Sequence, residues 1–220
     1  MKWRTSISQH KDGELYVRGK KLTDLIGEMT FTEAVFFILK GKKPTKEQAK
    51  LFDLVLVSAI DHGVEVPSVF VPRVVASTGN SVTSALASGI LSVGDYHGGA
   101  VEGAMKVLGS HGSAKEIVLE TVSAGKRIPG FGHKVYRDAD PRTVLIGEKM
   151  EKLGIKSKFW ELAIEIQHEL ESATDKKLPL NIDGAMAAVL CELGFDSIQG
   201  KMFFCICANA LYDGKHRRRD

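Results

Sequence analysis

Long hydrophobic runs are absent from this 220-residue sequence. No segment reaches the roughly 18 consecutive apolar residues of a membrane-spanning helix. The opening stretch, MKWRTSISQHKDGELYVRG, also lacks the apolar core of a secretion signal. We therefore expect a cytoplasmic protein with no membrane partner.

Cysteine is also scarce. The three cysteines, Cys191, Cys205 and Cys207, lie late in the chain in apolar surroundings. Their odd number and setting predict reduced thiols, as in cytosolic proteins. Cys205 and Cys207 would point in different directions on a helix, so we expect no shared metal site there.

Positively and negatively charged residues are nearly equal in number. The net charge is +3, and much of the excess lies in the C-terminal stretch GKHRRRD, residues 214–220. Such a tail is either plain solvated charge or a binding segment for phosphate or carboxylate. The mild excess favours small anionic ligands and argues against nucleic acid as a partner.

Strand alternation is confined to the beginning of the chain. TSISQ and ELYVRG flank HKDG, in which Asp12 and Gly13 form a turn signal, so we expect a short N-terminal β-hairpin. Everything after it has helical periodicity, with no repeat or low-complexity linker. Three pairs have capping-box spacing, namely Thr30 with Glu33, Thr45 with Gln48, and Ser113 with Glu116. The expected fold is all-α, with about ten helices.

Three segments bring an ionisable side chain to the start of a helix. In the first, GDYHGGAVEGAM, His97 precedes two glycines and an alanine-rich helix. A helix N-terminus disfavours a positively charged imidazole. A neutral His97 could donate a hydrogen bond to a carbonyl oxygen on which negative charge develops. The alternative is a histidine that only caps the helix.

The second segment is the loop IPGFGHKVYRDADPR, residues 128–142. Its glycines allow a ligand to approach the main chain beside His133. Arg142 follows Pro141 at the start of the next helix, where a guanidinium can bind a carboxylate through two hydrogen bonds. The alternative is a surface loop whose charged residues are merely solvated.

The third segment is KKLPLNIDGAMAAVL, in which Asp183 begins an apolar helix. Asp183 could be an ordinary N-cap or a partly desolvated general base. Lys176 and Lys177 could meet phosphates or be plain surface charges. His62 ends an earlier apolar helix in SAIDHG.

Together these segments resemble the citrate synthase family. HGGAVEGAM, RIPGFGHKVYRDADPR and NIDGAMAAVL are similar, in this order, to its three signature blocks, and the resemblance extends from Trp3 to about Leu193. It implies a homodimer or higher homo-oligomer with sites near the interface. It also implies a larger helical domain, residues 1–98 and 187–220, and a smaller one, residues 99–186, that close over the substrate.

The resemblance also implies roles for individual residues. Asp183 matches the residue that takes a proton from the acetyl methyl group of acetyl-CoA, and His97 matches the neutral donor to the thioester carbonyl. His133 matches the residue that hydrogen-bonds and protonates the oxaloacetate carbonyl. His62 and Arg142 match substrate-holding positions. Coenzyme A, a substrate and not a tightly bound cofactor, is expected at Ile128, Gly130, Phe131, Gly132 and Lys177.

The sequence departs from the family pattern in its length and near its end. It is much shorter than an ordinary citrate synthase, and Cys207 or Ala208 stands where an arginine facing the substrate is expected. Arg217, Arg218 or Arg219 could substitute. The compact form and the WRTSIS opening resemble citryl-CoA lyases and the C-terminal module of ATP-citrate lyase. We therefore expect cleavage of citryl-CoA to acetyl-CoA and oxaloacetate, with a CoA-ligase subunit as a possible partner.

Three alternatives stay open at this point. The chain could be a citrate synthase, which makes citrate and CoA from acetyl-CoA, oxaloacetate and water. It could be a non-catalytic relative that binds CoA thioesters. A metallohydrolase built on the histidines is the third, but no H-E-x-x-H or similar ligand spacing supports it, and we expect no metal.

Overall fold

The computed structural model describes residues 5–209, and its chain divides into two compact units between Asp53 and Leu54. We call the part before this boundary unit 1 and the part after it unit 2. Eleven helices and three short strands occur in the described residues, which confirms the mostly helical fold. None of these helices is long and apolar enough to span a bilayer.

Unit 1 begins with the expected hairpin. Strands β1 (Ser8–Lys11) and β2 (Glu14–Val17) pair antiparallel, and Asp12 and Gly13 take positive φ angles of 51° and 78° in the turn between them. A third strand, β3 (Lys20–Lys21), pairs with β2 and was not predicted. Two residues are too short to display alternation, so this strand depends on the neighbouring edge of β2.

The rest of unit 1 is helical. It contains α1 (Leu22–Leu25), α2 (Phe31–Lys40) and the first half of α3 (Lys46–Ser58), which crosses the unit boundary. The predicted capping box of Thr30 and Glu33 is present at the start of α2. Phe36 and Phe52 are fully buried and meet edge to face, with ring centroids 6.1 Å apart.

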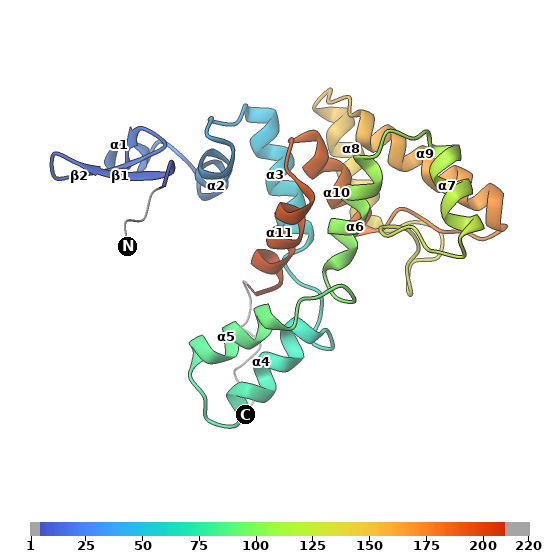
Figure 1. Cartoon of the computed structure of the whole chain (residues 1–220), viewed down its shortest axis with the longest axis horizontal. Coiled ribbons are helices and arrows are strands. Elements are labelled where there is room, and N and C mark those ends of the chain that lie inside the picture. The colour runs from blue at the N-terminus through green and yellow to red at the C-terminus, as the bar shows by residue number, and fades with distance from the viewer. Residues whose placement is uncertain (1–4, 210–220) are drawn as a thin grey trace. The chain divides into compact units, whose positions relative to one another are not determined.

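Unit 2 holds the remaining helices, which Figure 1 labels along the chain. They are α4 (Pro67–Ser77), α5 (Val82–Leu91), α6 (Gly99–Leu108), α7 (Ala114–Ser123), α8 (Pro141–Lys152), α9 (Lys158–Thr174), α10 (Ile182–Glu192) and α11 (Ser197–Asn209).

Helix α10 is the centre of unit 2. Its stretch from Gly184 to Leu190 has no charged residue and is buried on all sides, as expected for a helix that is apolar all round. It packs against α6, α8, α9 and α11. Because α10 is enclosed, the side chains of its first turn are held firmly where a cleft opens.

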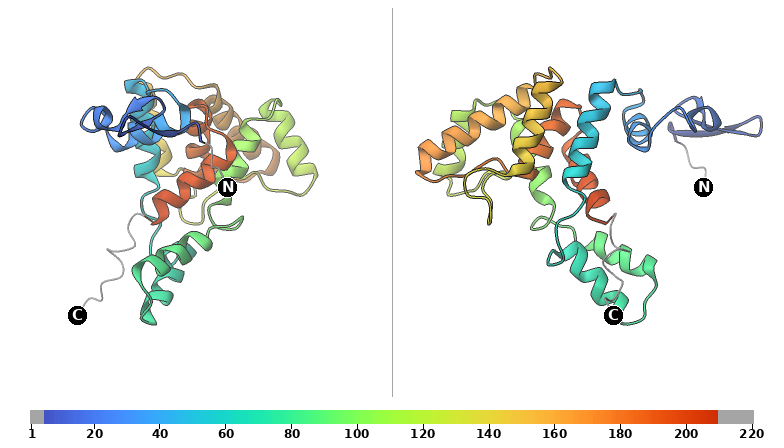
Figure 2. Two further views of the ribbon diagram at one scale, coloured as in Figure 1. Left: turned by 60° about the vertical axis from the view of Figure 1, so that its left-hand side comes forward. Right: turned by 180° about the vertical axis from the view of Figure 1, so that it is seen from behind.

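Helices α4 and α5 form a hairpin, residues 67–91, that packs mainly on itself and touches α11 (Figure 2). Small side chains let the two helices approach, and Ala76 and Ala85 form their shared buried centre. The division into a larger and a smaller domain, expected from the family resemblance, stays a prediction.

Candidate active site

A cleft of about 610 Å³ in unit 2, which we call the histidine cleft, collects side chains from segments far apart in the sequence. All five residues expected to act on the substrate line it, namely His62, His97, His133, Arg142 and Asp183. The other lining residues are Asp61, Val66, Asp95, Tyr96, Gly98, Ala100, Tyr136, Ile182 and Phe204.

His97 lies in the turn that leads into α6, where Gly94 and His97 exchange backbone hydrogen bonds. The N-cap of α6 is Gly98 in a left-handed conformation, so His97 does not cap the helix. Its Nε2 accepts a hydrogen bond from the Ser68 backbone amide (3.3 Å) and lies 2.8 Å from the Ser68 hydroxyl. With Nε2 as acceptor, the neutral ring carries its proton on Nδ1.

Burial keeps the His97 ring neutral. Desolvation lowers the pKa of His97, and Phe204 packs against the ring edge with centroids 5.2 Å apart. A neutral imidazole with a fixed Nδ1 proton can donate a hydrogen bond to a ligand oxygen without bringing a full charge into the site.

His133 has the opposite arrangement of ring nitrogens. Its Nδ1 accepts hydrogen bonds from the backbone amides of Val135 (3.0 Å) and Tyr136 (3.1 Å). Nε2 is therefore the nitrogen that carries the proton in the neutral ring. The Tyr136 ring lies against the imidazole with centroids 4.6 Å apart. The loop backbone thus sets both the tautomer and the orientation of His133.

Arg142 is held by an acidic neighbour. Asp140 is the N-cap of α8, is 1% exposed, and accepts from Arg142 Nε (3.0 Å) and Nη2 (2.7 Å). Pro141 is the first residue of the helix, as predicted. Burial opposes both charges, but the hydrogen bonds raise the pKa of Arg142 and lower that of Asp140, so both stay ionised. The fork leaves other guanidinium N–H groups for a ligand carboxylate.

Asp183 lies in the first turn of α10 but is not its N-cap, because Asn181 takes that position. The Asn181 Oδ1 accepts from the backbone amides of Asp183 (3.0 Å) and Gly184 (3.2 Å). In the described residues, no hydrogen bond or ion pair fixes the Asp183 carboxylate. Burial raises the pKa of Asp183, against the opposing charge of Arg142. This carboxyl group is free to exchange a proton with a ligand.

His62 and Phe204 form an aromatic wall of the histidine cleft, in contrast to the charged pair of Arg142 and Asp140. Both ring nitrogens of His62 are shielded from solvent, and its ring packs on Phe204 with centroids 4.8 Å apart. Among the α11 residues whose side chains the structure describes, Phe204 lines the cleft and Cys207 is buried. Arg142 is therefore the single Lys or Arg side chain among the described lining residues. Arg217, Arg218 and Arg219 lie outside the described residues.

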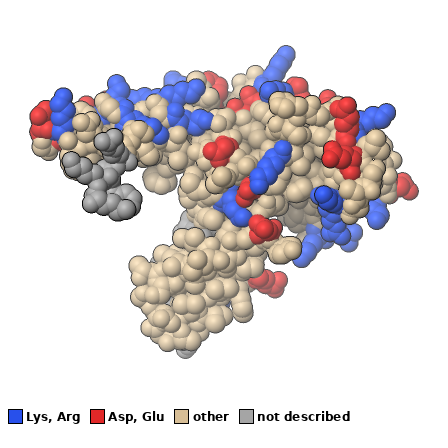
Figure 3. Space-filling model, in the orientation of Figure 1, with Lys and Arg blue, Asp and Glu red and all other residues tan. Residues whose placement is uncertain are grey.

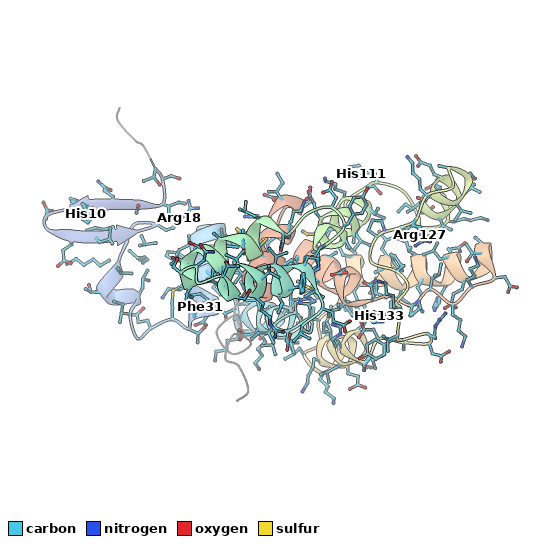
Figure 4. All side chains as sticks on the ribbon, turned by 90° about the horizontal axis from the view of Figure 1, so that it is seen from below. His10, Arg18, Phe31, His111, Arg127 and His133 are labelled. Atoms are coloured by element: carbon cyan, nitrogen blue, oxygen red, sulfur yellow. The ribbon has the colours of Figure 1, made fainter. Side chains whose placement is uncertain are left out.

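A second cleft, of about 500 Å³, shares His133 with the first. We call it the basic cleft because Lys126, Arg127, Lys134 and Lys176 line it, beside Ile128, Phe131 and Gly132. Figure 4 labels Arg127 and His133, which both lie on the connection between α7 and α8. Three of the residues expected to meet coenzyme A are thus in its wall.

The two other residues expected at the coenzyme A site have different surroundings. Gly130 is buried with φ of 91°, and a Cβ added there would lie 2.7 Å from the Gly184 Cα atom. It is needed for the close approach of the loop to α10. Lys177 forms an exposed ion pair with Asp138 at 2.5 Å, whereas Lys176 lines the basic cleft.

The described residues contain no group of three or more His, Cys, Asp or Glu side chains arranged to hold a metal ion. The cleft instead brings together the imidazoles of His97 and His133, the buried carboxyl group of Asp183 and the guanidinium of Arg142. These groups suit chemistry in which negative charge moves between carbonyl oxygens and a carbon atom.

Comparison with known proteins decides the family. The family profile described as "Citrate synthase, C-terminal domain" matches residues 38–210. The chain belongs to the citrate synthase family. "Citrate synthase 2" of Bacillus subtilis is 33% identical over 171 residues, which cover 74% of this chain and 45% of that protein. The chain thus spans about half the length of the curated family members it matches.

Solved structures of the citrate synthase family give the same fold. Citryl-CoA lyase from Hydrogenobacter thermophilus is 39% identical, with a TM-score of 0.91 and coverage of 99% of this chain and 91% of that one. ATP citrate lyase from Methanothrix soehngenii, in complex with citrate and coenzyme A, is 21% identical with a TM-score of 0.87. It covers all of this chain and 41% of its own length, and at this identity it supports the fold alone.

Sequence reasoning missed four residues that shape the site. These are Ser68, Asp140, Asn181 and Phe204. Asp140 and Asn181 could have been recognised as N-caps, because each is a favoured capping residue directly before the start of a helix. Ser68 and Phe204 gave no such signal, since their contacts with the histidines join segments distant in the chain.

Proposed function

We propose that this chain cleaves citryl-CoA to acetyl-CoA and oxaloacetate, in a reaction that can also run backwards. The observation that supports this most is the likeness to citryl-CoA lyase, which covers nearly the whole of both chains at 39% identity. The likeness to citrate synthases covers less than half of the Bacillus subtilis relative.

In this proposal the two histidines stabilise the two oxygens whose charge changes. His97 donates from Nδ1 to the thioester oxygen, which becomes an enolate oxygen when the carbon–carbon bond breaks. In the cleavage direction the citryl hydroxyl passes its proton to His133 Nε2 as its oxygen becomes the oxaloacetate ketone, and in the condensation direction His133 returns that proton to the ketone oxygen. Donors fixed before the reaction need no reorganisation as the charge moves.

Asp183 exchanges a proton with the methyl carbon. In the cleavage direction it delivers a proton to the enolate carbon and so forms acetyl-CoA. In the condensation direction it removes that proton. Burial raises the pKa of Asp183 and so favours its protonated form, which is the form that delivers a proton in the cleavage direction.

Arg142 and His62 hold the oxaloacetate part of the substrate. The fork between Arg142 and Asp140 keeps the guanidinium in one orientation and so prepares it for a carboxylate. A second carboxylate needs another cation, and the tail residues Arg217, Arg218 and Arg219 are our candidates. Closure of the smaller domain, residues 99–186, would exclude water from the cleft.

We assign the basic cleft to coenzyme A. Its four cationic side chains suit phosphate groups, and its apolar wall suits the pantetheine arm. Because His133 belongs to both clefts, a thioester that lies in the basic cleft would bring its reacting end into the histidine cleft. Ile128, Phe131 and Gly132 contribute main chain and apolar surface to this path.

We also propose that the protein works as a homodimer through the α4–α5 hairpin. Arg73 is the single charged residue between Val66 and Gly94, and the lobe over α4 and α5 is almost entirely tan in Figure 3. Phe70 is 57% exposed and Leu91 is 84% exposed. An uncharged apolar surface of this kind favours burial against another protein surface, and a second copy provides a matching one.

The cellular setting follows from the same proposal. Free cysteines at Cys191, Cys205 and Cys207 support a cytoplasmic location. A lyase that does not make its own citryl-CoA needs a CoA-ligating subunit or enzyme to supply it.

Incubation of the purified protein with citryl-CoA, followed by product analysis, tests the activity. Acetyl-CoA and oxaloacetate are the expected products. Citrate and free CoA would favour the citrate synthase alternative, which is supported by the similarity to curated citrate synthases. Binding of citryl-CoA with no product would leave a non-catalytic relative and reject the proposed reaction.

A further inference from the structure

The side chain of Asn181 lies between the two segments that carry His133 and Asp183. Its Nδ2 donates to the Gly132 carbonyl at 2.8 Å, and its Oδ1 accepts from the Asp183 amide at 3.0 Å. The Gly132 carbonyl belongs to the peptide bond directly before His133, and the Asp183 amide to the peptide bond directly before Asp183. One planar amide group therefore joins the backbones of both residues.

The surrounding backbone shows where this bridge is needed. Gly132 N donates to Pro179 O at 2.8 Å, Asn181 N donates to Gly130 O at 3.0 Å, and Phe131 and Leu180 form the β-bridge between them. This short ladder fixes the register of the two segments and ends at Gly132. The next peptide unit, which leads to His133, is held by the Asn181 side chain.

Capping of α10 does not by itself require asparagine. Ser113 caps α7 and Ser157 caps α9 through a hydroxyl that accepts one backbone amide. Serine, aspartate and asparagine are about equally good caps. Asparagine differs because the same planar group offers both an acceptor and a donor, and here both are used.

We propose that Asn181 is a positioning residue that couples the His133 loop to the first turn of α10 and so sets the spacing between His133 and Asp183. This inference rests on the proposed lyase reaction, in which His133 acts on the oxygen and Asp183 on the carbon of one substrate. A shift of about 1 Å between two such groups can cost on the order of a hundredfold in rate.

Two substitutions separate positioning from capping. Asn181→Ser keeps an N-cap but cannot reach the Gly132 carbonyl, and Asn181→Ala removes both interactions. We expect Asn181→Ser to unfold at nearly the wild-type temperature and to lose roughly 10- to 100-fold in kcat, with KM for citryl-CoA within about threefold. Asn181→Ala should lose kcat to a similar degree and also unfold at a lower temperature.

Ser113→Ala is the matched control, because it removes a cap from a helix whose first turn does not line either cleft. It should lower the unfolding temperature and leave kcat unchanged. Wild-type kcat in Asn181→Ser would overturn the proposal, since capping alone would then account for the residue.

Amide hydrogen exchange tests the positioning role of Asn181 independently of the proposed reaction. The amides of Val135 and Tyr136 donate to the His133 ring, so their protection reports how firmly that ring is held. In Asn181→Ser they should exchange roughly tenfold faster than in the wild type, with the α10 amides unchanged. A wild type that does not cleave citryl-CoA would reject the proposed reaction. Equal exchange of the Val135 and Tyr136 amides in the wild type and in Asn181→Ser would overturn the positioning role of Asn181.

Discussion

Ser68 and His97, 29 residues apart in the chain, meet through one ring nitrogen. The Ser68 hydroxyl lies 2.8 Å from His97 Nε2, and the Ser68 backbone amide donates to the same atom at 3.3 Å. Ser68 is 2% exposed, so this contact is sealed from solvent. The start of α4 therefore determines which nitrogen of His97 carries the proton, and burial lowers the pKa of the ring.

Ser68→Ala tests this contact. The backbone amide still donates to Nε2, but the ring loses one hydrogen-bonding neighbour worth about 1 kcal/mol. We expect kcat for citryl-CoA cleavage to fall roughly fivefold, with little change in KM. Ser110→Ala removes a hydroxyl that bonds to Val107 O near the end of α6 and serves as the control. Equal rates in the two variants would contradict a role for Ser68.

Asp183→Asn should remove the acid–base group and leave the fold intact. General acid–base groups contribute about 10²- to 10⁴-fold, so kcat should fall by that factor in either direction. Binding of coenzyme A should stay near the wild-type affinity, because the basic cleft does not include Asp183. Calorimetric titration with coenzyme A and a coupled assay measure the two quantities. Retention of more than a tenth of the activity would exclude Asp183 as the proton carrier.

The same substitution should change how stability depends on pH. Burial raises the pKa of Asp183 above its usual 3.8, so the folded chain binds this proton more tightly than the unfolded chain does. Below that usual pKa, Asp183 is protonated in both states and its burial does not lower the free energy of unfolding. As the pH rises through the raised pKa, the buried group must ionise and the free energy of unfolding of the wild type falls. Asp183→Asn should therefore gain in unfolding temperature over the wild type between acidic and neutral pH. A constant difference across thermal scans in this range would count against the raised pKa.

Lys176 and Lys177 are adjacent but should differ in their effect on coenzyme A. Lys176 lines the basic cleft, whereas Lys177 is paired with Asp138 on the surface. We expect Lys176→Ala to weaken coenzyme A binding roughly threefold, a size typical of an exposed charge interaction. Lys177→Ala should have a smaller effect. The difference should shrink at high salt, because exposed charges are screened, and the reverse order of effects would reject our assignment of the cleft.

Charge introduced into the α4–α5 hairpin should disrupt the dimer. Phe70→Glu with Leu91→Glu removes two large apolar side chains from the interface, at about 1.5–3 kcal/mol each. Analytical ultracentrifugation should then find monomers under conditions where the wild type is dimeric. Leu119→Glu, at a residue of α7 that is 65% exposed, is the control and should stay dimeric. A wild type that is monomeric would reject the interface.

Local patterns in the sequence predicted most of the helical elements. Capping boxes at Thr30 and Ser113 are present as predicted, because the side chains that form them are three residues apart and need no tertiary partner. The hairpin turn at Asp12 and Gly13 is equally local. The strand β3 was missed because its two residues are extended only through pairing with β2.

The sequence by itself determined the helical class and the starts of the helices, since these depend on residue type and short spacing. Its resemblance to the citrate synthase family indicated the five residues that now line one cleft. Tertiary structure decided the rest. It made Nε2 of His97 an acceptor through Ser68, joined the Asn181 side chain to the Gly132 carbonyl, and placed Phe204 of α11 in the wall of the cleft. Each of these depends on contacts between segments tens of residues apart, and no periodicity in the chain encodes such contacts.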